Sequence, residues 1–421
     1  MTIMSRRRKS APPAPHEYQQ AWVNWSRQSA AVPAVTVHPR SEHEVAECVR
    51  YAIANGLAVR PVGASHSWSP LCATSAMLID MTGISGIEAV DTVRKRAVIH
   101  AGTRISAAGP ALWDHGLSLI NQGDIDAQTM VGAISTGTHG SGVTMGNLSS
   151  TVRRVRLVDG RGDIVEIAED QPDLLRAAQL SLGLLGVITS IEIEVTDAYY
   201  LEEELTYPTW NELVSDMPAD LAGNHHYSLW WLPADESAAL YNLAVPDDLP
   251  LADRSVRRRI NKCPGPARDT SASRVDRNYV IHPGPFEGNY FEAEIFVDAG
   301  HALTAMTRIR DICRHHRPEE VFPVQPRWVK GDDAYLSPAY RADSVGISIA
   351  GSPRTDFDGH LSEVTAALDD MNPRMHWGKL HHLDAQLIRD RYPELPAFND
   401  ARRRLDPLGL FLNDYTRELF T

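Results

Sequence analysis

The sequence predicts an α+β protein of two domains, the second built on an antiparallel sheet. Strand and helix patterns alternate from about residue 30 to 197, without the repeated strand–helix–strand units of a doubly wound sheet. The composition changes after Thr196, and 421 residues are enough for two hydrophobic cores. We therefore expect one domain over 19–198, a second over 199–370, and a segment over 371–421 that returns to the first.

Local patterns predict the elements of the first domain. A capping box at Ser41 and Glu44, an apolar stripe and a closing Asn55-Gly56 pair predict a helix. Alternating apolar residues and turn signals predict the other elements. In order, these are strands over 57–62 and 98–101, a helix over 104–116, a strand over 117–120, a hairpin of strands over 151–158 and 163–167, a helix over 174–180 and a strand over 186–195.

Three further segments complete the expected organisation. Residues 1–18 are basic and proline-rich, so they are expected to form a disordered tail. In the second domain, a Pro- and Arg-rich stretch over about 247–285 is expected to be a loop. Two helices, over 299–316 and 357–371, are expected to back the antiparallel sheet.

The overall charge limits the classes of partner. With 41 Lys and Arg against 54 Asp and Glu, the net charge is −13, which argues against a nucleic acid or an anionic membrane surface. The basic runs at 6–9, 257–259 and 402–404 are expected to be solvated surface or tail. No run reaches the roughly 18 apolar residues of a membrane span.

Cysteine usage and the N-terminus predict a cytoplasmic protein. The four cysteines show neither a C-x-x-C spacing nor the density of a disulfide framework. Arg6-Arg7 suggests a twin-arginine export signal, but no apolar stretch follows it. Adjacent histidine pairs at 225–226, 315–316 and 381–382 point apart on a helix or a strand, so no metal site is expected.

Two segments of small residues carry the strongest functional signal. The first, 60–68, follows a predicted strand and holds His66 among Gly, Ala and Ser residues, whose backbone amides can approach an anion closely. The second, 132–142, reads Gly-Thr-His-Gly-Ser-Gly over 137–142. Neither matches G-x-G-x-x-G or precedes a Walker A lysine, which disfavours a Rossmann or P-loop nucleotide site.

Both segments resemble the flavin-binding motifs of the vanillyl-alcohol oxidase-type flavoproteins, and most of all the branch of alditol oxidases and aldonolactone oxidases and dehydrogenases. His376-Trp377-Gly378-Lys379 and Leu336-Ser337-Pro338-Ala339-Tyr340 resemble two further motifs of that branch. The resemblance runs from about Trp25 to the end of the chain. It implies a two-domain FAD-binding fold of the PCMH or VAO type, in which a substrate domain caps the flavin domain, and it implies FAD as the cofactor.

The resemblance also implies which residues hold the flavin. His66 matches a histidine that is commonly bonded to the flavin methyl carbon; the alternative is a loop histidine that hydrogen-bonds phosphate or backbone. Because no cysteine lies in 132–142, we expect a single covalent link. The expected cofactor contacts are Pro61, Val62, Gly63, Ala64, Ser65, His66, Ser67, Gly123, Gly132, Thr136, Gly137, Thr138, His139, Gly140, Gly142, Gly186, Val187, Ile188, His376 and Asn413.

Lys379 and Arg327 are the expected catalytic residues. Flavin oxidises an alcohol by taking a hydride at N5 while the hydroxyl proton leaves, and a nearby cation stabilises the developing alkoxide. The resemblance places both side chains, with Gln325, at the substrate hydroxyl; the alternative is that they are surface charges. Gln325 stands where the related motif has glutamate. A weaker acceptor thus replaces a carboxylate, which weakens the case for a sugar-polyol substrate.

Gly123 and Asp124 follow the strand predicted over 117–120. The resemblance places Gly123 beside the flavin, where a small residue leaves room for O2 and therefore favours an oxidase. Asp124 would reach the substrate side; the alternative is an exposed turn aspartate.

The sequence thus predicts FAD-dependent oxidation of a CH–OH group in a polyol, an aldonolactone or a sugar-like alcohol, with O2 as acceptor and H2O2 as product. Three alternatives remain open at this point. One is a dehydrogenase that uses a cytochrome or quinone acceptor. Another is an oxidase that tailors a larger secondary metabolite. The third is a non-catalytic carbohydrate- or cofactor-binding protein with the same fold.

Overall fold

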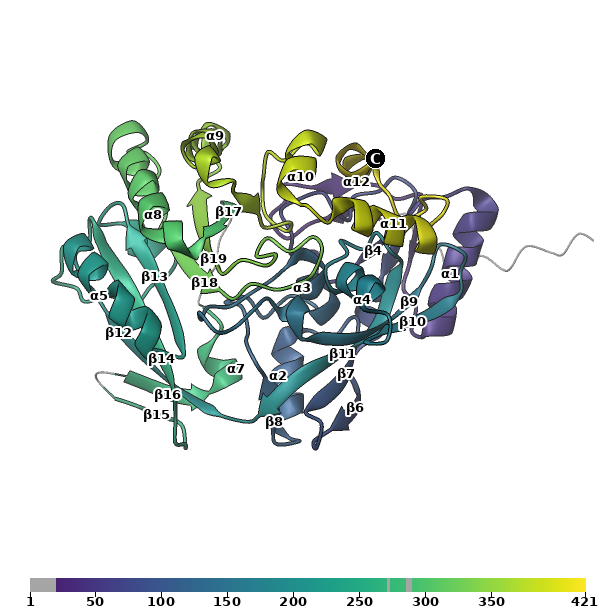
Figure 1. Ribbon diagram of the computed structural model, residues 1–421, viewed down its shortest axis with the longest axis horizontal. Helices are drawn as coiled ribbons and strands as arrows, with labels where there is room; N and C mark the ends of the chain where they lie inside the picture. Colours follow the sequence, from purple (N-terminus) through teal and green to yellow (C-terminus); the bar gives the residue numbers. More distant parts are fainter. Residues whose placement is uncertain (1–19, 271–272, 285–289) are drawn as a thin grey trace, which may run out of the picture.

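Residues 20–270, 273–284 and 290–421 are described by a computed structural model of the chain (Figure 1). The tail expected over residues 1–18 lies outside them. Two regions of mixed sheet and helix stand side by side in Figure 1, and the C-terminal helices, in yellow, lie along the first region. None of the helices in these residues combines the length and the apolar character needed to cross a membrane.

A small parallel sheet opens the first region. Its strand order is β3-β5-β4, and α1 connects β3 to β4. As predicted, Ser41 caps this helix by accepting a hydrogen bond from the Glu44 backbone at 3.2 Å, and Gly56 ends it at a φ of 66°. The bounds are β3 Val35–Val37, α1 Glu42–Asn55, β4 Val59–Val62 and β5 Met77–Asp80. A two-stranded hairpin, β1 Trp22–Val23 and β2 Ala30–Ala31, precedes the sheet.

An antiparallel sheet forms the rest of the first region and confirms the strands, hairpin and helices predicted there. Strand β11 lies between β9 and β7 and also pairs with β8. Helix α3 occupies part of the small-residue segment 132–142, for which the sequence had indicated no regular element. The bounds are β6 Ile87–Asp91, β7 Arg96–His100, α2 Ile105–Trp113, β8 Leu117–Leu119, α3 Met130–Thr136, β9 Val152–Val158, β10 Ile164–Ala168, α4 Pro172–Gln179 and β11 Val187–Asp197.

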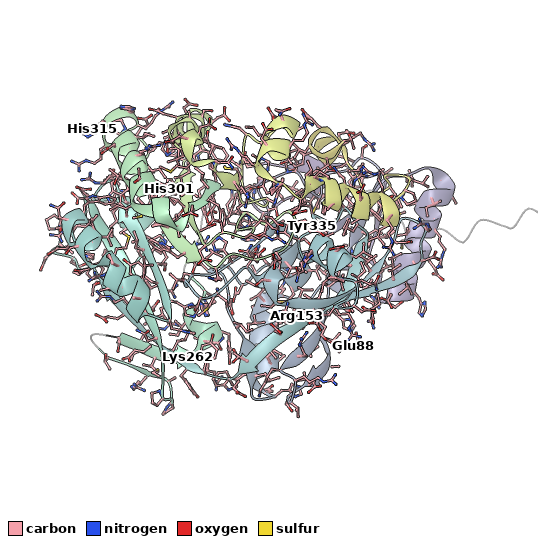
Figure 2. All side chains as sticks on the ribbon, in the orientation of Figure 1. Glu88, Arg153, Lys262, His301, His315 and Tyr335 are labelled. Carbon is pink, nitrogen blue, oxygen red and sulfur yellow. The ribbon has the colours of Figure 1, made fainter. Side chains whose placement is uncertain are left out.

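Ion pairs between strands cover one face of this sheet. Arg153 on β9 donates to Glu194 on β11 at 2.5 Å, and Arg156 on β9 donates to Glu88 on β6 at 2.8 Å. Figure 2 labels Glu88 and Arg153, which both lie toward the lower surface of the first region in that view. Solvent-exposed pairs of this kind each contribute up to about 1 kcal/mol, so the apolar inner face contributes most of the stability of the sheet.

The second region is a nine-stranded antiparallel sheet in the described residues, as the sequence predicted. Its order is β15-β16-β12-β14-β13-β18-β19-β17-β20, and α5, α8 and α9 pack against it on the outer side of the molecule in Figure 1. The bounds are β12 Tyr200–Thr206, α5 Trp210–Gly223, β13 His226–Leu232, α6 Ser237–Leu240, β14 Arg254–Cys263, β15 Arg268–Asp269, β16 Ser273–Arg277, α7 Asn278–Ile281, β17 Phe291–Asp298, α8 Ala302–Asp311, β18 Gln325–Val329, β19 Ser344–Gly351, α9 Phe357–Ala367 and β20 Arg374–Met375. Short helical turns at Ala299–His301, Ile312–His316 and Asp369–Met371 extend α8 and α9 to the predicted helix limits.

The prediction of a loop over about 247–285 was wrong for the central part of this segment. Strand β14 lies inside the sheet between β12 and β13, and β15, β16 and α7 follow it. The run at 257–259 is not solvated surface, because Arg257 and Arg258 are only 7% and 5% exposed. Each is neutralised by two carboxylates: Arg257 contacts Asp216 and Asp220, and Arg258 contacts Glu203 and Asp124. Paired arginines can occupy a buried strand that unpaired ones could not.

The last segment packs against the first region. Its helices are α10 Ala385–Arg391, α11 Leu395–Leu405 and α12 Asp414–Phe420. The backbone of Val59 donates to the Leu410 carbonyl at 2.8 Å, and Phe411 is buried in the core that α1 and the parallel sheet form. Arg402, expected to be solvated with its neighbours, is instead buried on α11, while Arg403 and Arg404 are exposed.

Candidate active site

The loop after β4 forms one wall of a cavity of about 870 Å³. The loop can approach the segment before α3 only because Gly63 has no side chain: a Cβ there would overlap the Thr129 hydroxyl. Thr129 in turn caps α3 by accepting from the Gly132 backbone at 3.2 Å. The opposite wall comes from α3 and from the start of β11. Of the expected cofactor contacts, Pro61, Val62, Gly63, Ala64, Ser65, His66, Ser67, Gly132, Thr136, Gly186 and Ile188 line this cavity.

Arg60 anchors the cavity from behind. Its buried guanidinium donates to the carbonyls of Leu71 and Leu182, each at 2.7 Å, and to the Phe411 carbonyl in the C-terminal segment. Burial lowers its pKa to about 10. One side chain thus connects the loop, the segment before β11 and the C-terminal segment. This role was not apparent from the sequence.

His66 is held by the N-terminal hairpin. The Trp22 indole donates to the Ser65 hydroxyl at 2.9 Å, and the Trp25 ring lies 4.6 Å from the His66 ring. Burial, with smaller contributions from the charges of Lys379 and Arg104, lowers the pKa of His66 to about 4. The Nε2 atom of His66 is buried and has no hydrogen-bond partner among the described residues. The ring is therefore neutral near pH 7 and has a ring nitrogen free for a further bond.

A second cavity, of about 630 Å³, meets the first at His66, Ser67, Gln128 and Thr136. It collects the catalytic candidates from segments far apart in the chain. Of the expected site residues, Gly123, Asp124, Thr138, His139, Gln325, Arg327, His376 and Lys379 line it. The backbone of Trp68 donates to the Gly378 carbonyl at 2.8 Å, which joins the two expected motifs directly.

Arg327 belongs to a buried charge network. Its guanidinium donates to Glu294 at 2.6 Å and contacts Asp124 at 3.4 Å, and His139 Nε2 lies 2.9 Å from the same Glu294 oxygen. Burial by itself would raise the pKa of Glu294, but the charges of Arg327 and His139 hold it well below its usual range. Glu294 therefore stays ionised, and the negative charge keeps the buried arginine charged.

Lys379 is held between a carboxylate and an aromatic ring. Its ammonium contacts Glu292 Oε2 and lies 4.2 Å from the centre of the Trp68 ring. The other Glu292 oxygen accepts from the Ser348 hydroxyl at 2.6 Å. Lys379 and Arg327 are thus both ion-paired within the cavity, and neither is a free surface charge.

Asp124 and Gln325 lie side by side. The Gln325 amide nitrogen donates to Asp124 at 2.8 Å, and Arg258 from β14 contacts the other Asp124 oxygen at 3.3 Å. Asp124 is therefore a largely buried carboxylate in the cavity and not an exposed turn aspartate. The amide of Gln325 is fixed by this bond, which leaves its carbonyl oxygen as the acceptor.

Five expected cofactor residues line neither cavity. Asn413 caps α12, and its amide donates to the carbonyls of Pro70 and Ala73 at 3.0 and 2.8 Å, so its side chain is used in packing. Val187 points into the core of the parallel sheet. Three glycines are required by the backbone conformation or by close packing. Gly137 ends α3. Gly140 and Gly142 pass so close to the carbonyls of Gln122 and His225, respectively, that a side chain would not fit.

Two glutamates of the second cavity were missed at the sequence level. Glu292 and Glu294 on β17 supply the carboxylates that the glutamine at position 325 seemed to remove. Alternate residues of a strand share a face, so two acids in the sequence Phe-Glu-Ala-Glu-Ile-Phe-Val would have indicated a polar patch on an otherwise buried strand. The sequence therefore contained a signal for the two glutamates, but it did not indicate which side chains they pair with.

Within the part of the chain that the structure describes, no group of three or more His, Cys, Asp or Glu side chains is placed to hold a metal ion.

Comparison with known proteins agrees with this geometry. A family model described as an FAD binding domain matches residues 33–168, and one described as D-arabinono-1,4-lactone oxidase matches residues 241–419. L-gulono-1,4-lactone dehydrogenase of Mycobacterium tuberculosis is 30% identical over 423 residues, which cover 94% of this chain and 98% of the relative. The chain belongs to the aldonolactone oxidase branch of the vanillyl-alcohol oxidase-type flavoproteins.

Other members of this flavoprotein branch match over similar lengths. Alditol oxidase of a Streptomyces species is 27% identical over 95% of this chain and 99% of its own length. L-gulonolactone oxidase of Bos taurus is 25% identical over 94% and 97% of the two chains. Cholesterol oxidase from Brevibacterium sterolicum superposes with a TM-score of 0.83 at 15% identity, covering 98% of this chain and 99% of that one, which shows the shared fold. The predicted two-domain FAD-binding fold is confirmed.

The residues present fit FAD. A cavity lined by small residues, a loop that passes where a Cβ would overlap its neighbour, and an unpartnered, neutral imidazole nitrogen suit a cofactor with an anionic pyrophosphate and an electrophilic methyl group. The protein is an FAD-dependent oxidoreductase that acts on CH–OH groups.

Proposed function

We propose that the protein oxidises a CH–OH group of a polyol, an aldonolactone or a sugar-like alcohol, with FAD bonded to His66 and O2 as the electron acceptor. The meeting of the two cavities at His66 is the observation that carries this proposal. The first cavity suits a dinucleotide, and the second is lined by charged side chains that suit a hydroxylated substrate. A cofactor bonded to His66 adjoins both.

Each residue of the second cavity has a proposed task. When bound, FAD would supply the acceptor for the hydride that leaves the substrate carbon. Lys379 and Arg327 stabilise negative charge on the substrate oxygen. Asp124 and the carbonyl oxygen of Gln325 accept hydrogen bonds from the other hydroxyl groups. Because Lys379 and Arg327 are both paired with carboxylates, the cavity favours an uncharged substrate over a sugar acid.

The case for a secondary-metabolite tailoring enzyme has become weaker. It rested on the loss of a carboxylate at Gln325 and on an unusual loop over 247–285. Glu292 and Glu294 now supply carboxylates, and β14 forms the centre of that segment. A non-catalytic binding protein is disfavoured by Lys379 and Arg327 lining the cavity.

A dehydrogenase is the second candidate, because the relative from M. tuberculosis carries that name. Gly123 supports the oxidase: it lines the second cavity, and a Cβ on it would lie 3.1 Å from the His139 carbonyl and 3.2 Å from the Thr138 methyl group. Gly123→Ala is expected to slow reoxidation of the reduced enzyme by O2 while leaving anaerobic reduction unchanged. An unaltered reoxidation rate would refute a role for Gly123 in O2 access.

The test of the proposal begins with the purified protein on a denaturing gel under ultraviolet light after acid treatment. A fluorescent band that disappears in His66→Ala is expected, and a dark band would refute the covalent link. A panel of polyols and aldonolactones, including L-gulono-1,4-lactone and D-arabinono-1,4-lactone, is then screened for flavin bleaching and peroxide. Bleaching without peroxide, but with reduction of a dye or a cytochrome, would indicate the dehydrogenase.

A further inference from the structure

Oxidation of a CH–OH group releases a hydroxyl proton, and the cations of the second cavity cannot accept it. An arginine guanidinium and a lysine ammonium carry only donors. Gln325 carries an amide, which is not basic enough to take a proton at neutral pH. The proton acceptor must therefore be sought among the histidines and the carboxylates.

Three histidines line the cavity. His66 is the proposed attachment point of the flavin, and the other two are already held by hydrogen bonds. His139 has the Glu294 carboxylate at 2.9 Å from Nε2 and the Gly140 carbonyl at 2.8 Å from Nδ1, so neither nitrogen is free. His376 accepts from the Gly378 backbone with Nδ1 at 3.0 Å. Burial lowers the pKa of His376 to about 3, so the ring is neutral and Nε2 carries its single proton. Neither ring offers a lone pair to a substrate hydroxyl.

The three carboxylates differ in their partners. Asp124 is contacted by two arginines and by the Gln325 amide. The Glu294 side chain has no exposed surface and is held by Arg327 and His139. Glu292 has one cation, Lys379, and one neutral donor, Ser348. It is thus the carboxylate with the least positive charge around it, and the cation it contacts is the one expected at the substrate oxygen.

We propose that Glu292, coupled to Lys379, accepts the hydroxyl proton of the substrate, a role that rests on the proposed function. The C–H bond breaks with both electrons leaving as hydride to bound FAD, and the O–H bond breaks with its proton going to the Lys379–Glu292 pair. Glu292 changes from carboxylate to carboxylic acid, and Lys379 ends with the three protons it had at the start. The substrate carbon and oxygen become a carbonyl group.

The arrangement of β17 suits this role. The carbonyl of Glu292 accepts from the Leu380 backbone at 2.9 Å, and that of Glu294 accepts from the His376 backbone at 3.0 Å, so the segment carrying Lys379 is attached to the strand at both ends. These two backbone hydrogen bonds therefore fix the position of Lys379 relative to Glu292. Proton transfer requires such fixed hydrogen-bond geometry.

Glu292→Gln is the direct test, because the amide keeps the shape but cannot accept a proton. The flavin-loaded variant is mixed anaerobically with whichever lactone or polyol of the panel reduces the wild type. The rate of flavin reduction is expected to fall by about 10²- to 10⁴-fold. The substrate dissociation constant, measured by the change in flavin absorbance or by calorimetry with Glu292→Gln and its unreduced flavin, is expected to change far less.

Two further variants separate proton transfer from packing. Glu292→Ala in the presence of formate is expected to recover part of the rate, because a small carboxylate can enter the vacated space. Ser348→Ala, which removes only the neutral hydrogen bond, is expected to retain most of the rate.

A Glu292→Gln variant that reduces its flavin at the wild-type rate would overturn the proposal. So would a Glu292→Ala variant whose rate does not respond to formate. If no member of the panel reduces the wild-type flavin, the proposed function fails first, and the role of Glu292 fails with it.

Discussion

The two cavities that meet at His66 are built in opposite ways. The first takes most of its lining from two short stretches of chain, 60–72 and 128–136, and uses small side chains and backbone. The second takes its side chains from the loop at 123–125, from β17 and β18, and from the segment 376–379, among others, and most of these side chains are polar or charged. One cavity is local in sequence and the other is assembled across the whole fold.

This difference explains what each cavity can recognise. Backbone amides approach a pyrophosphate only where side chains are absent, so the first cavity depends on a pattern of small residues. In the second cavity each buried cation needs a buried anion from another element, because an unpaired charge in the interior is too costly. We therefore expect substitutions in the first cavity to affect cofactor binding and substitutions in the second to affect chemistry.

Arg327→Met is expected to have the largest effect. It removes the cation that contacts both Glu294 and Asp124, so the rate of flavin reduction should fall by at least about 10³-fold. Flavin content, read from the absorption spectrum, should remain. Lys330→Met is the matched control, since Lys330 forms an exposed pair with Asp343 at 2.9 Å and should leave the rate unchanged. Loss of flavin in Arg327→Met would contradict the separation of the two cavities.

Gly63→Ala is expected to affect the first cavity alone. The added Cβ overlaps the Thr129 hydroxyl, and overpacking of this kind costs about 1–3 kcal/mol, or roughly 5- to 150-fold in affinity for FAD. Uptake of FAD by apoprotein and the flavin content after purification measure the effect. Gly223→Ala, where a Cβ meets open space, should bind FAD normally. Normal flavin content in Gly63→Ala would show that the loop can move.

Acid is expected to destabilise both cavities through their neutral histidines. The pKa of His376 is lowered from 6.5 to about 3 and that of His66 to about 4, chiefly by burial. Below pH 6.5 the unfolded chain binds protons that the folded chain does not, so stability falls as the pH falls. For His376 the loss at pH 5 is about 2 kcal/mol. Melting temperatures at pH 7 and pH 5 measure it, and the difference should shrink in His376→Asn.

Asn413→Ala is expected to have the smallest effect, and to act on stability only. The substitution removes a helix cap and hydrogen bonds to the carbonyls of Pro70 and Ala73, which together contribute about 2 kcal/mol. A lower melting temperature with unchanged flavin content is the expected result. Asn55→Ala, at an exposed helix end, is the control. Loss of flavin well below the melting temperature would restore the cofactor role first expected for Asn413.

The elements that the sequence predicted are those whose local pattern agrees with their environment. The helix after Ser41 has its cap, its apolar stripe and its terminal glycine in the sequence, and all three act locally. Strand β14 fails this rule because its arginines suggest exposed surface. The strand can be buried only because the acids of β12 and α5, together with Asp124 in the second cavity, neutralise its arginines.

The candidate site shows the same division. The sequence by itself indicated the small-residue loop with His66, because close backbone approach requires consecutive small residues. It also indicated Lys379 and Arg327 through their motifs. The tertiary structure alone decided that Glu292 pairs with Lys379, that Glu294 joins His139 to Arg327, and that Asn413 serves packing. Charge pairing is a property of atoms a few ångströms apart, and the partners here are separated by 33 to 155 residues of chain.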